Sequence, residues 1–362
     1  MSTEIPMKGL ILSGGKGTRM RPLTYTSAKQ LIPVANKPVL QYGIEAIVGA
    51  GIREIAIIVS PETGNEIRAA IGDGTRFGAQ VHYIEQDAPR GLAHAVMVAE
   101  PFLQKSPFVM YLGDNLLQHG ITPLVEEYRS LNCNSEILLT KVPDPTQFGV
   151  AELSADGRVV RLTEKPKEPK SDLALVGVYM FDQTIFEAVK SIKPSFRNEL
   201  EITDAIQWLI DHGYSVHPHI VKGWWKDTGK IEDMLEANRT VLDTFEMDVR
   251  GQSDEKSRIE GKVLLEEGAE VIDSVIRGPA IIGAGSRIVH AYVGPYTSIG
   301  RGCTVECCEI ENSIVLENSR IAHVDGRIEA SLIGKNVKIG RTQRKPVAYR
   351  FMLGDNSDVG IT

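Results

Sequence analysis

The sequence predicts two domains in series: an α/β domain with a mostly parallel sheet, followed by a parallel β-helix. Up to about residue 245, short apolar runs alternate with amphipathic helical stretches, which is typical of βαβ units. After about residue 255, aliphatic residues instead recur every six positions. The length, 362 residues, also exceeds what one hydrophobic core usually serves. We therefore expect a first domain over residues 1–250 and a second over 251–362.

In the first domain, each element follows from a run of apolar or amphipathic character. Strands are expected at residues 8–13, 54–60, 81–86, 107–114, 136–142 and 175–181. Helices are expected between them at residues 39–51, 64–74, 93–103 and 121–131. The glycine-rich loop SGGKGTRMRP directly follows the first strand, at the sheet edge where ligands of open α/β sheets bind.

In the second domain, two periodicities overlap. Residues six apart are Ile276, Ile282 and Ile288; Val293, Ile299 and Val305; Ile310 and Leu316; and Ile333 and Ile339. Residues 17 apart are Ile259, Ile276, Val293 and Ile310. Three faces of about six residues make one coil, as in hexapeptide-repeat β-helices, and the pattern is similar to the left-handed kind. The rival interpretation is a meander of short antiparallel strands. Residues 341–350 leave the pattern, and FMLGDNSDVGI is expected to form a final strand or cap.

The overall composition excludes several classes of protein. The chain is 42% hydrophobic and 24% charged, which is typical of globular folds, and its net charge of −7 argues against general nucleic-acid binding. We find no apolar run long enough for a membrane span and no signal peptide, so a cytoplasmic chain is expected. The four cysteines form no C-x-x-C pair, which argues against a cysteine zinc site or a disulfide framework.

The glycine-rich loop has the chemistry of a phosphate site. It matches neither G-x-x-x-x-G-K-[ST] nor G-x-G-x-x-G, yet its glycines allow backbone N–H groups to approach an anion closely. Arg19 adds a fork of charged donors. Lys29 lies ten residues further on, before an apolar turn that we expect near the same sheet edge. Two cations beside such a loop favour phosphate binding over a solvated surface.

Two segments, LILSGGKGTRMRPLT and KQLIPVANKP, together resemble the sugar-1-phosphate nucleotidylyltransferases. Further blocks resemble that family in the same order: YLGDN, TQFGVAEL, TEKPKEPKS, LVGVYMF, RNELEITD and WWKDTG. The combination is most similar to the glucose-1-phosphate thymidylyltransferases, and the appended repeats, ending in LGDNSDV, resemble the long form of that group. The resemblance implies a Rossmann-like nucleotidyltransferase domain, a left-handed β-helix, and a transferase making dTDP-glucose and pyrophosphate from dTTP and glucose 1-phosphate.

The resemblance also implies a set of nucleotide-binding residues. These are Leu12, Gly14, Gly15, Gly17, Thr18, Arg19, Gln30, Gln86, Gly91 and Asp114. The amides of Gln30 and Gln86 can donate and accept hydrogen bonds, as the edge of a pyrimidine requires. The segment PRGLAHA departs from the family where His94 replaces a common Gln, which leaves the base contacts open.

For the second substrate and the metal, the resemblance implies two further groups of residues. Sugar-phosphate binding is implied for Gly149, Glu164, Lys165, Tyr179 and Glu199. Asp114 and Asp227 are implied to hold Mg²⁺, a hard cation that carboxylates suit, although each aspartate alone could simply cap a loop or helix. Arg19, Lys29 and Lys165 would be catalytic, because their charges offset the repulsion between two phosphates in an in-line displacement.

Three alternatives stay open. The enzyme could use UTP instead of dTTP, or it could be bifunctional, with the β-helix acting as an acyltransferase through His290 or His323. A regulatory protein with an inactive nucleotide fold is the third, and the intact Arg19, Lys29 and aspartates argue against it. The expected partners are the two small-molecule substrates and further copies of the chain, associated through the β-helix, without nucleic acid or membrane.

Overall fold

The computed structural model describes residues 5–15, 17–131 and 133–341. Two compact units are present. The first comprises Met1–Lys16, Ser27–Leu31 and Val39–Asp227, and the second comprises Gly17–Thr26, Ile32–Pro38 and Thr228–Thr362. The expected final strand in FMLGDNSDVGI lies outside the described residues. The domain boundary between residues 250 and 251 stays a prediction.

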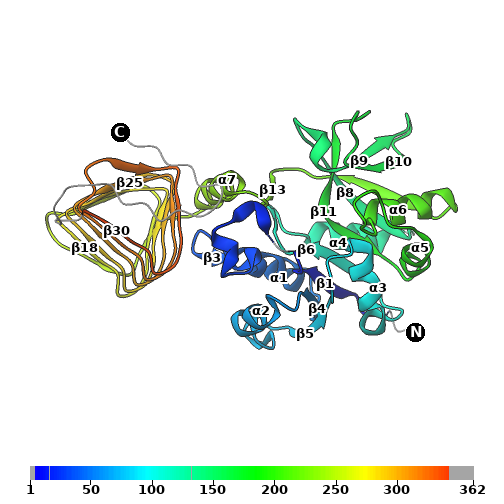
Figure 1. Ribbon diagram of the computed structural model, residues 1–362, viewed down its shortest axis with the longest axis horizontal. Helices are drawn as coiled ribbons and strands as arrows, with labels where there is room; N and C mark the ends of the chain where they lie inside the picture. The colour runs from blue at the N-terminus through cyan, green and yellow to red at the C-terminus, as the bar shows by residue number, and fades with distance from the viewer. Residues whose placement is uncertain (1–4, 16, 132, 342–362) are drawn as a thin grey trace. The chain divides into compact units, whose positions relative to one another are not determined.

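A nine-stranded mixed sheet forms the centre of the first unit (Figure 1). Its strands are β1 (Lys8–Leu12), β4 (Glu54–Val59), β5 (Gln80–Glu85), β6 (Phe108–Leu112), β8 (Ser135–Lys141), β9 (Gly149–Leu153), β10 (Val159–Glu164), β11 (Leu173–Phe181) and β12 (Val216–Ile220). Strands β5, β4, β1 and β6 are parallel neighbours, and β11 then pairs antiparallel with β6. The parallel part has the topology expected from the alternating sequence, and β1 lies inside it between β4 and β6.

Helices cover both faces of this sheet. They are α1 (Val39–Gly49), α2 (Gly64–Ile71), α3 (Leu92–Leu103), α4 (Thr122–Ser130), α5 (Ile185–Ser191) and α6 (Ile202–Asp211). Because successive strand residues point to opposite faces, Leu10 packs into a core with α3, α5 and α6, whereas Ile11 packs into a core with α1, α2 and α4. Among the helices that the structure describes, none combines the length and apolarity needed to cross a bilayer.

A short two-stranded ladder lies beyond the end of β6. It consists of β7 (Asn115–Leu117) and β13 (Trp225–Asp227), which pair antiparallel. Asp114 immediately precedes β7 and Asp227 ends β13, so the ladder carries the two aspartates that are expected to hold Mg²⁺.

The second unit contains a left-handed parallel β-helix built from three sheets, whose coils stack in Figure 1 from yellow to red. One sheet consists of β14 (Asp248–Val249), β17 (Val263–Leu265), β20 (Ala280–Ile282), β23 (Thr297–Ile299), β26 (Ile314–Val315) and β29 (Leu332–Ile333). The second consists of β15 (Gln252–Ser253), β18 (Glu270–Ile272), β21 (Arg287–Val289), β24 (Thr304–Glu306), β27 (Arg320–Ala322) and β30 (Lys338–Gly340). The third consists of β16 (Arg258–Glu260), β19 (Val275–Arg277), β22 (Tyr292–Val293), β25 (Glu309–Glu311) and β28 (Arg327–Glu329). All of these strands pair in parallel, so the antiparallel meander is wrong.

The 17-residue spacing predicts the register of the coils. Ile259 pairs with Ile276, and Val293 pairs with both Ile276 and Ile310, so these side chains stack in one column. The six-residue spacing fails at one position. Val315, and not Leu316, pairs with Ile299 and lies in the core, because that coil is one residue shorter than its neighbours.

A hairpin and a helix complete the second unit. The hairpin strands β2 (Pro33–Val34) and β3 (Lys37–Pro38) are joined by two residues in the left-handed region, and α7 (Ile231–Leu242) carries the fully buried Asn238. The Asn238 Oδ1 accepts hydrogen bonds from the backbone N–H of Ala35 (2.8 Å) and from the Ser298 hydroxyl (2.7 Å). Its amide group donates to the Tyr296 carbonyl (3.0 Å). One side chain therefore links the hairpin and α7 to the β-helix.

Candidate functional site

The carboxyl end of β1 is fixed by hydrogen bonds to both neighbouring strands. The carbonyl of Leu12 accepts from the N–H of Gly113 (2.9 Å), and the N–H of Ser13 donates to the carbonyl of Ile58 (2.9 Å). Ser13 is fully buried, and its hydroxyl has no hydrogen-bond partner within the described residues. The chain therefore leaves the sheet in a defined direction at Gly14, with a buried polar group beneath it.

Two glutamines flank the first two glycines of the loop. A Cβ on Gly14 would lie 3.3 Å from the Gln86 Oε1, and a Cβ on Gly15 would lie 3.8 Å from the Gln30 Nε2. Gln30 is 2% exposed, and in the described part of the chain its Oε1 has no hydrogen-bond partner. Because a buried amide oxygen without a partner is costly, this group is suited to a ligand.

Two residues of the segment PRGLAHA, Gly91 and His94, set the orientation of the Gln86 side chain. The Gln86 Nε2 donates to the carbonyl of Gly91 (3.2 Å) and lies 3.0 Å from the Nδ1 of His94. Burial, and then the charge of Arg90, lowers the pKa of His94, so its ring is neutral and its Nδ1 can accept this bond. With both amide hydrogens directed this way, the Gln86 Oε1 faces Gly14 as an acceptor.

Gly91 is required by its own backbone environment. Its φ is +101°, and a Cβ there would lie 2.3 Å from the carbonyl oxygen of Leu200. The Leu200 backbone also donates to the carbonyl of Arg90 (2.7 Å) and accepts from the N–H of Ala93 (3.0 Å). The glycine thus admits a neighbouring chain segment at the start of α3, and its contact with a base stays a prediction.

Lys29 and Asp114 form an ion pair, although 85 residues separate them in the sequence. Burial alone would raise the pKa of Asp114, but the charge and hydrogen bond of Lys29 and the Asn115 amide outweigh this effect, so the pKa is lower than usual. The carboxylate also accepts from the Asn115 Nδ2 (3.0 Å). The site therefore carries one anionic carboxylate and one cation close together.

Asn115 fixes the position of the two aspartates. Its Oδ1 accepts from the Trp225 indole (2.6 Å) and from the backbone of Gly177 (3.2 Å). In the β7–β13 ladder, Asn115 pairs with Asp227, so Asp114 and Asp227 lie at the same end of the ladder. Two half-buried carboxylates there provide the oxygen donors that Mg²⁺ prefers, so the donor set fits that ion.

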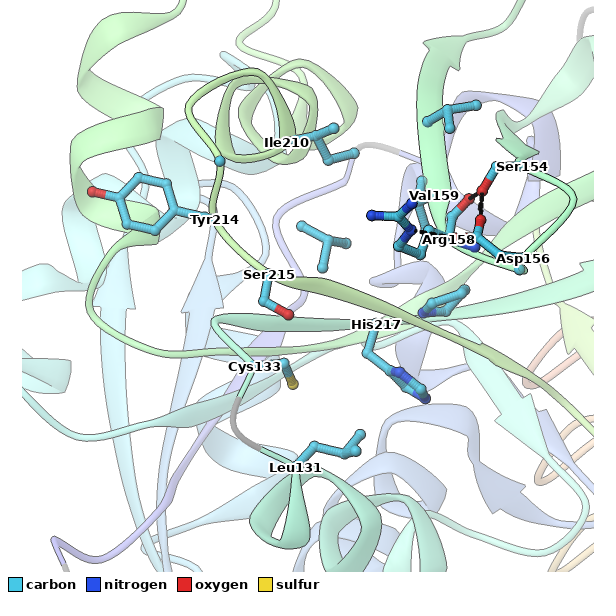
Figure 2. Close-up of a pocket in the computed structure, with 15 residues that line it drawn as sticks. Leu131, Cys133, Ser154, Asp156, Arg158, Val159, Ile210, Tyr214, Ser215 and His217 are labelled. Atoms are coloured by element: carbon cyan, nitrogen blue, oxygen red, sulfur yellow. Dashed lines mark hydrogen bonds and ion pairs between the residues drawn. The ribbon is translucent and has the colours of Figure 1, made fainter.

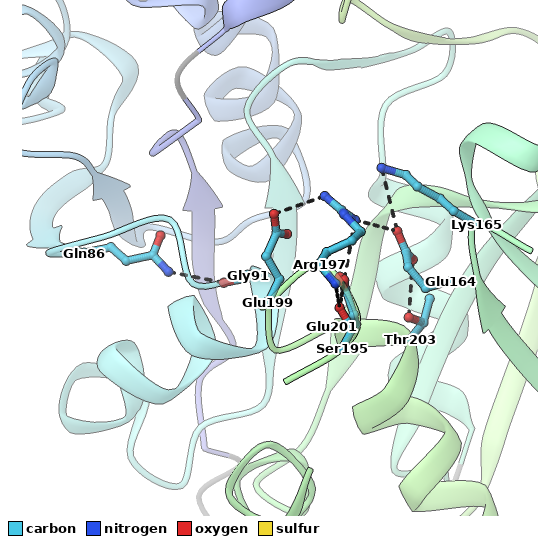
Figure 3. Close-up of polar contacts among 9 residues, drawn as sticks. All are labelled: Gln86, Gly91, Glu164, Lys165, Ser195, Arg197, Glu199, Glu201 and Thr203. Atoms are coloured by element: carbon cyan, nitrogen blue, oxygen red, sulfur yellow. Dashed lines mark hydrogen bonds and ion pairs between the residues drawn. The ribbon is translucent and has the colours of Figure 1, made fainter. Parts of the chain in front are cut away.

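A second polar cluster lies where β9 and β10 end. Glu164 pairs with Gly149, and a Cβ on Gly149 would lie 2.6 Å from the side chain of Thr203 and 3.3 Å from the Glu164 Oε2. The Glu164 carboxylate contacts the Arg197 guanidinium (3.2 Å) and the Thr203 hydroxyl (3.3 Å), as Figure 3 shows. Burial, and then the charge of Glu201, raises the pKa of Glu164, while the cations nearby oppose this shift.

The other residues expected to contact the sugar lie around Glu164. The Lys165 ammonium lies 3.9 Å from the Glu164 carboxylate, and Glu199 forms an ion pair with Arg197 (3.1 Å). Tyr179 is almost fully buried in the core, and burial followed by the charge of Glu164 raises its pKa. The structure thus gathers Gly149, Glu164, Lys165, Tyr179 and Glu199 in one region, while their contacts with a sugar stay predictions.

Three other residues of the glycine-rich loop, Gly17, Thr18 and Arg19, belong to the second unit. Gly17 adopts the left-handed conformation (φ 61°), and its carbonyl accepts from the Thr24 hydroxyl (2.7 Å). Thr18 and Arg19 are exposed in the short 3-10 helix that follows. Participation of these three residues in one site with Asp114 stays a prediction, and Lys16 lies outside the described residues.

Sequence reasoning did not select Arg197, although it lies in the quoted block RNELEITD. Its guanidinium contacts Glu164, Glu199 and, at 3.5 Å, the nearly buried Glu201. An arginine within an acidic segment is an available indication of such a cluster, but Glu164 is 33 residues away in the sequence. Asn115 was also not selected, because an amide after an aspartate is unremarkable until its partners are known.

Comparisons with known proteins support one family. The nucleotidyl transferase family model matches residues 8–244. A glucose-1-phosphate thymidylyltransferase of Streptomyces griseus is 54% identical over 356 residues, which cover 98% of this chain and 100% of the relative. The "Bifunctional protein GlmU" of Methanocaldococcus jannaschii is 35% identical over 98% of this chain and 89% of its own. A solved structure of UDP-glucose pyrophosphorylase with UDP-glucose matches with a TM-score of 0.61 and 25% identity, covering 66% of this chain and 99% of that one.

Proposed function

Since the chain belongs to the nucleotidyl transferase family, within its long glucose-1-phosphate thymidylyltransferase group, we propose that it transfers a thymidylyl group from dTTP to glucose 1-phosphate. The products are dTDP-glucose and pyrophosphate. The full-length similarity to the Streptomyces griseus enzyme supports this choice of substrates, because it includes both the nucleotidyl transferase region and the β-helix.

The orientation of Gln86 is the structural observation that carries the proposal. Its Oε1 faces Gly14 as an acceptor, because His94 and Gly91 occupy its amide hydrogens. Thymine and uracil present an N–H donor at ring position 3, whereas cytosine presents an acceptor there. An acceptor beside the loop therefore favours thymine or uracil, and the Gln30 amide supplies a second group for a base edge.

The reaction is an in-line displacement. A phosphate oxygen of glucose 1-phosphate attacks the α-phosphorus of dTTP, a new P–O bond forms, and the bond to the β-phosphate breaks to release pyrophosphate. Two unit charges 4 Å apart repel by about 4 kcal/mol at an effective dielectric constant of about 20. Arg19, Lys29 and Lys165 offset this repulsion, and alignment of the substrates supplies much of the remaining rate enhancement.

Asp114 and Asp227 would hold Mg²⁺, with phosphate oxygens and water completing its coordination. The ion, when bound, supplies positive charge that polarises the phosphate oxygens. Lys29 lies against Asp114 and keeps that carboxylate deprotonated, which is the state a metal ligand requires.

Glu164 would accept hydrogen bonds from sugar hydroxyl groups. Arg197 and Thr203 hold its carboxylate, and the absence of a side chain on Gly149 allows Thr203 to pack closely there. Lys165 follows directly in the chain and would bind the sugar phosphate. Arg197 acts here as a positioning residue, because it contacts Glu164 and Glu199 together.

UTP is the second candidate nucleotide, because the structure of UDP-glucose pyrophosphorylase has the same fold and uracil has the same N–H donor. Direct identification of the product tests the main proposal. Purified protein with Mg²⁺, dTTP and glucose 1-phosphate should release pyrophosphate and form dTDP-glucose, both measured by chromatography and mass spectrometry. Absence of nucleotide sugar with every nucleoside triphosphate would refute nucleotidyl transfer to this sugar.

A further inference from the structure

A cluster of metal-ligating side chains lies on the first unit, on elements that the proposed reaction does not use. Ligand atoms of Glu127, Glu136 and His219 all lie within 4.8 Å of one another. They come from helix α4, strand β8 and strand β12, respectively. We propose that these three residues form a binding site for a divalent transition metal ion of the Zn²⁺ class.

The pairing of two strands explains how the cluster forms. Strand β12 pairs in parallel with β8, and His217 lies opposite Glu136 in the register. His217 and His219 are two residues apart, so both share the face of the sheet on which Glu136 lies. Helix α4 packs on that face, since Leu124 and Val125 share a core with Leu138 of β8, and it contributes Glu127.

Glu136 provides the independent indication of a ligand. Its side chain is fully buried, and neither carboxylate oxygen has a hydrogen-bond partner within the described residues. Burial, and then the charge of Glu127, raises the pKa of Glu136 to about 8. A buried carboxyl group without a partner is unfavourable, and a divalent cation shared with Glu127 would satisfy both carboxylates.

The other ligands are already oriented. The Glu127 Oε2 lies 2.7 Å from the His219 Nδ1, and its Oε1 lies 3.3 Å from the His217 Nε2. His217 is therefore a positioning residue that fixes the second oxygen of a ligand carboxylate. The donor set of two carboxylates and an imidazole suits Zn²⁺ and related ions, whereas Mg²⁺ and Ca²⁺ prefer oxygen ligands alone.

A pocket of about 790 Å³ lies beside β12 and includes the positioning residue His217 in its lining, while the three proposed ligands lie outside that lining. Figure 2 shows His217 and Cys133 among its lining residues, with Tyr214 at the side. The site contains no cysteine ligand, so it is compatible with a cysteine spacing that shows no zinc motif.

The location suggests a structural role. Strand β12 pairs only with β8 among the described strands, so it is an edge strand, and the ion would join it to α4. Residues 221–224 connect β12 to β13, which ends at Asp227. An ion bound here would restrain the segment that leads to this predicted ligand of Mg²⁺.

Metal binding by the full-length chain tests the proposal. Protein stripped with a chelator is equilibrated with Zn²⁺ in the presence of millimolar Mg²⁺, which occupies oxygen-only sites. Bound zinc is measured by elemental mass spectrometry and affinity by competition with a chromophoric chelator. We expect one Zn²⁺ per chain, loss of this ion in Glu136→Gln and His219→Ala, and an affinity about 10- to 100-fold weaker in His217→Ala.

Matched variants separate this site from others. Glu126→Gln changes the exposed neighbour of Glu127 on the same helix and should bind zinc like the wild type. Asp114→Asn should also retain zinc, which shows that the ion is not at the predicted Mg²⁺ site. Absence of zinc from the wild type would overturn the proposal. Zinc binding by Glu136→Gln and His219→Ala equal to that of the wild type would also overturn it.

Co²⁺ bound to the wild-type chain provides a readout that does not depend on variant folding. Visible absorption bands of Co²⁺ with nitrogen and oxygen ligands should appear and then disappear when Zn²⁺ displaces the ion. Absence of any such change with stoichiometric Co²⁺ would contradict the site. Because no readout is catalytic, failure here would leave the proposed nucleotidyl transfer untouched.

Discussion

Lys29 forms an ion pair with Asp114, and this contact joins the segment that follows the glycine-rich loop to the turn that follows β6. The pair lowers the pKa of a carboxyl group that burial alone would raise. The carboxylate is therefore anionic at neutral pH in the substrate-free protein. A negatively charged carboxylate is the state that the proposed Mg²⁺ ligand requires.

Asp114→Asn should reduce kcat by at least about 100-fold, because it removes one of two carboxylates proposed to hold Mg²⁺. The amide is nearly the same size as the carboxylate, so the fold should be retained. Pyrophosphate release measures the rate, and far-UV circular dichroism measures the fold. Asp211→Asn, at an exposed position at the end of α6, is the control and should leave both unchanged. Loss of folding in Asp114→Asn would make Asp114 a structural residue.

The KM for the nucleoside triphosphate should rise as the pH falls. The pKa of His94 lies below its usual value of about 6.5, so the ring is neutral at pH 7, and its Nδ1 accepts from Gln86. Protonation at lower pH removes this acceptor and disturbs the amide that faces Gly14. His94→Gln retains an acceptor that does not titrate, so the ratio of wild-type to variant KM should increase between pH 7 and pH 5. A constant ratio would show that the triphosphate alone titrates.

Glu164→Gln should raise the KM for glucose 1-phosphate about 10- to 100-fold, because hydrogen bonds to a charged group contribute about 1.5–3 kcal/mol. The KM for the nucleotide should not change, because Glu164 lies in the separate cluster with Arg197 and Thr203. Steady-state kinetics with each substrate varied in turn provides the measurement. Glu168→Gln, in the exposed part of the same EKPKEPK segment, is the matched control. Equal effects on both KM values would argue against a sugar site.

Asn238→Ala should lower the free energy of unfolding of the second unit by about 3 kcal/mol. The change removes three hydrogen bonds and leaves the Ala35 N–H and the Ser298 hydroxyl without their buried acceptor. Urea unfolding monitored by circular dichroism measures the loss. Thr240→Ala, two residues further along α7, should change stability by less than about 0.5 kcal/mol. A similar stability for both variants would show that Asn238 does not hold the hairpin.

Sequence periodicity predicts the β-helix well, because each coil places its residues directly over those of the coil before. Ile259, Ile276, Val293 and Ile310 stack as their spacing of 17 residues requires. The prediction fails where a coil loses one residue and Val315 replaces Leu316 in the column. Both residues are aliphatic, so the sequence contains no preference between them.

The sequence predicts those residues of the site that lie in motifs of a known family, and it does not predict which of them contact one another. Lys29 and Asp114 are selected from separate motifs, and the structure brings them together. Arg197 lies between α5 and α6 and is missed because its importance arises from Glu164, at the end of β10. The Glu136 cluster is missed for the same reason, since its ligands come from three elements with no characteristic spacing.

The nucleotide preference with glucose 1-phosphate tests the central claim most directly. Initial rates of pyrophosphate release would be measured with dTTP, UTP, dCTP and CTP at matched Mg²⁺ and a fixed concentration of glucose 1-phosphate. We predict the highest kcat/KM for dTTP, a lower value for UTP, and values near background for both cytosine nucleotides, because the Gln86 Oε1 accepts from N3–H. A cytosine nucleotide used as well as dTTP, or no release with any nucleotide, would contradict this account.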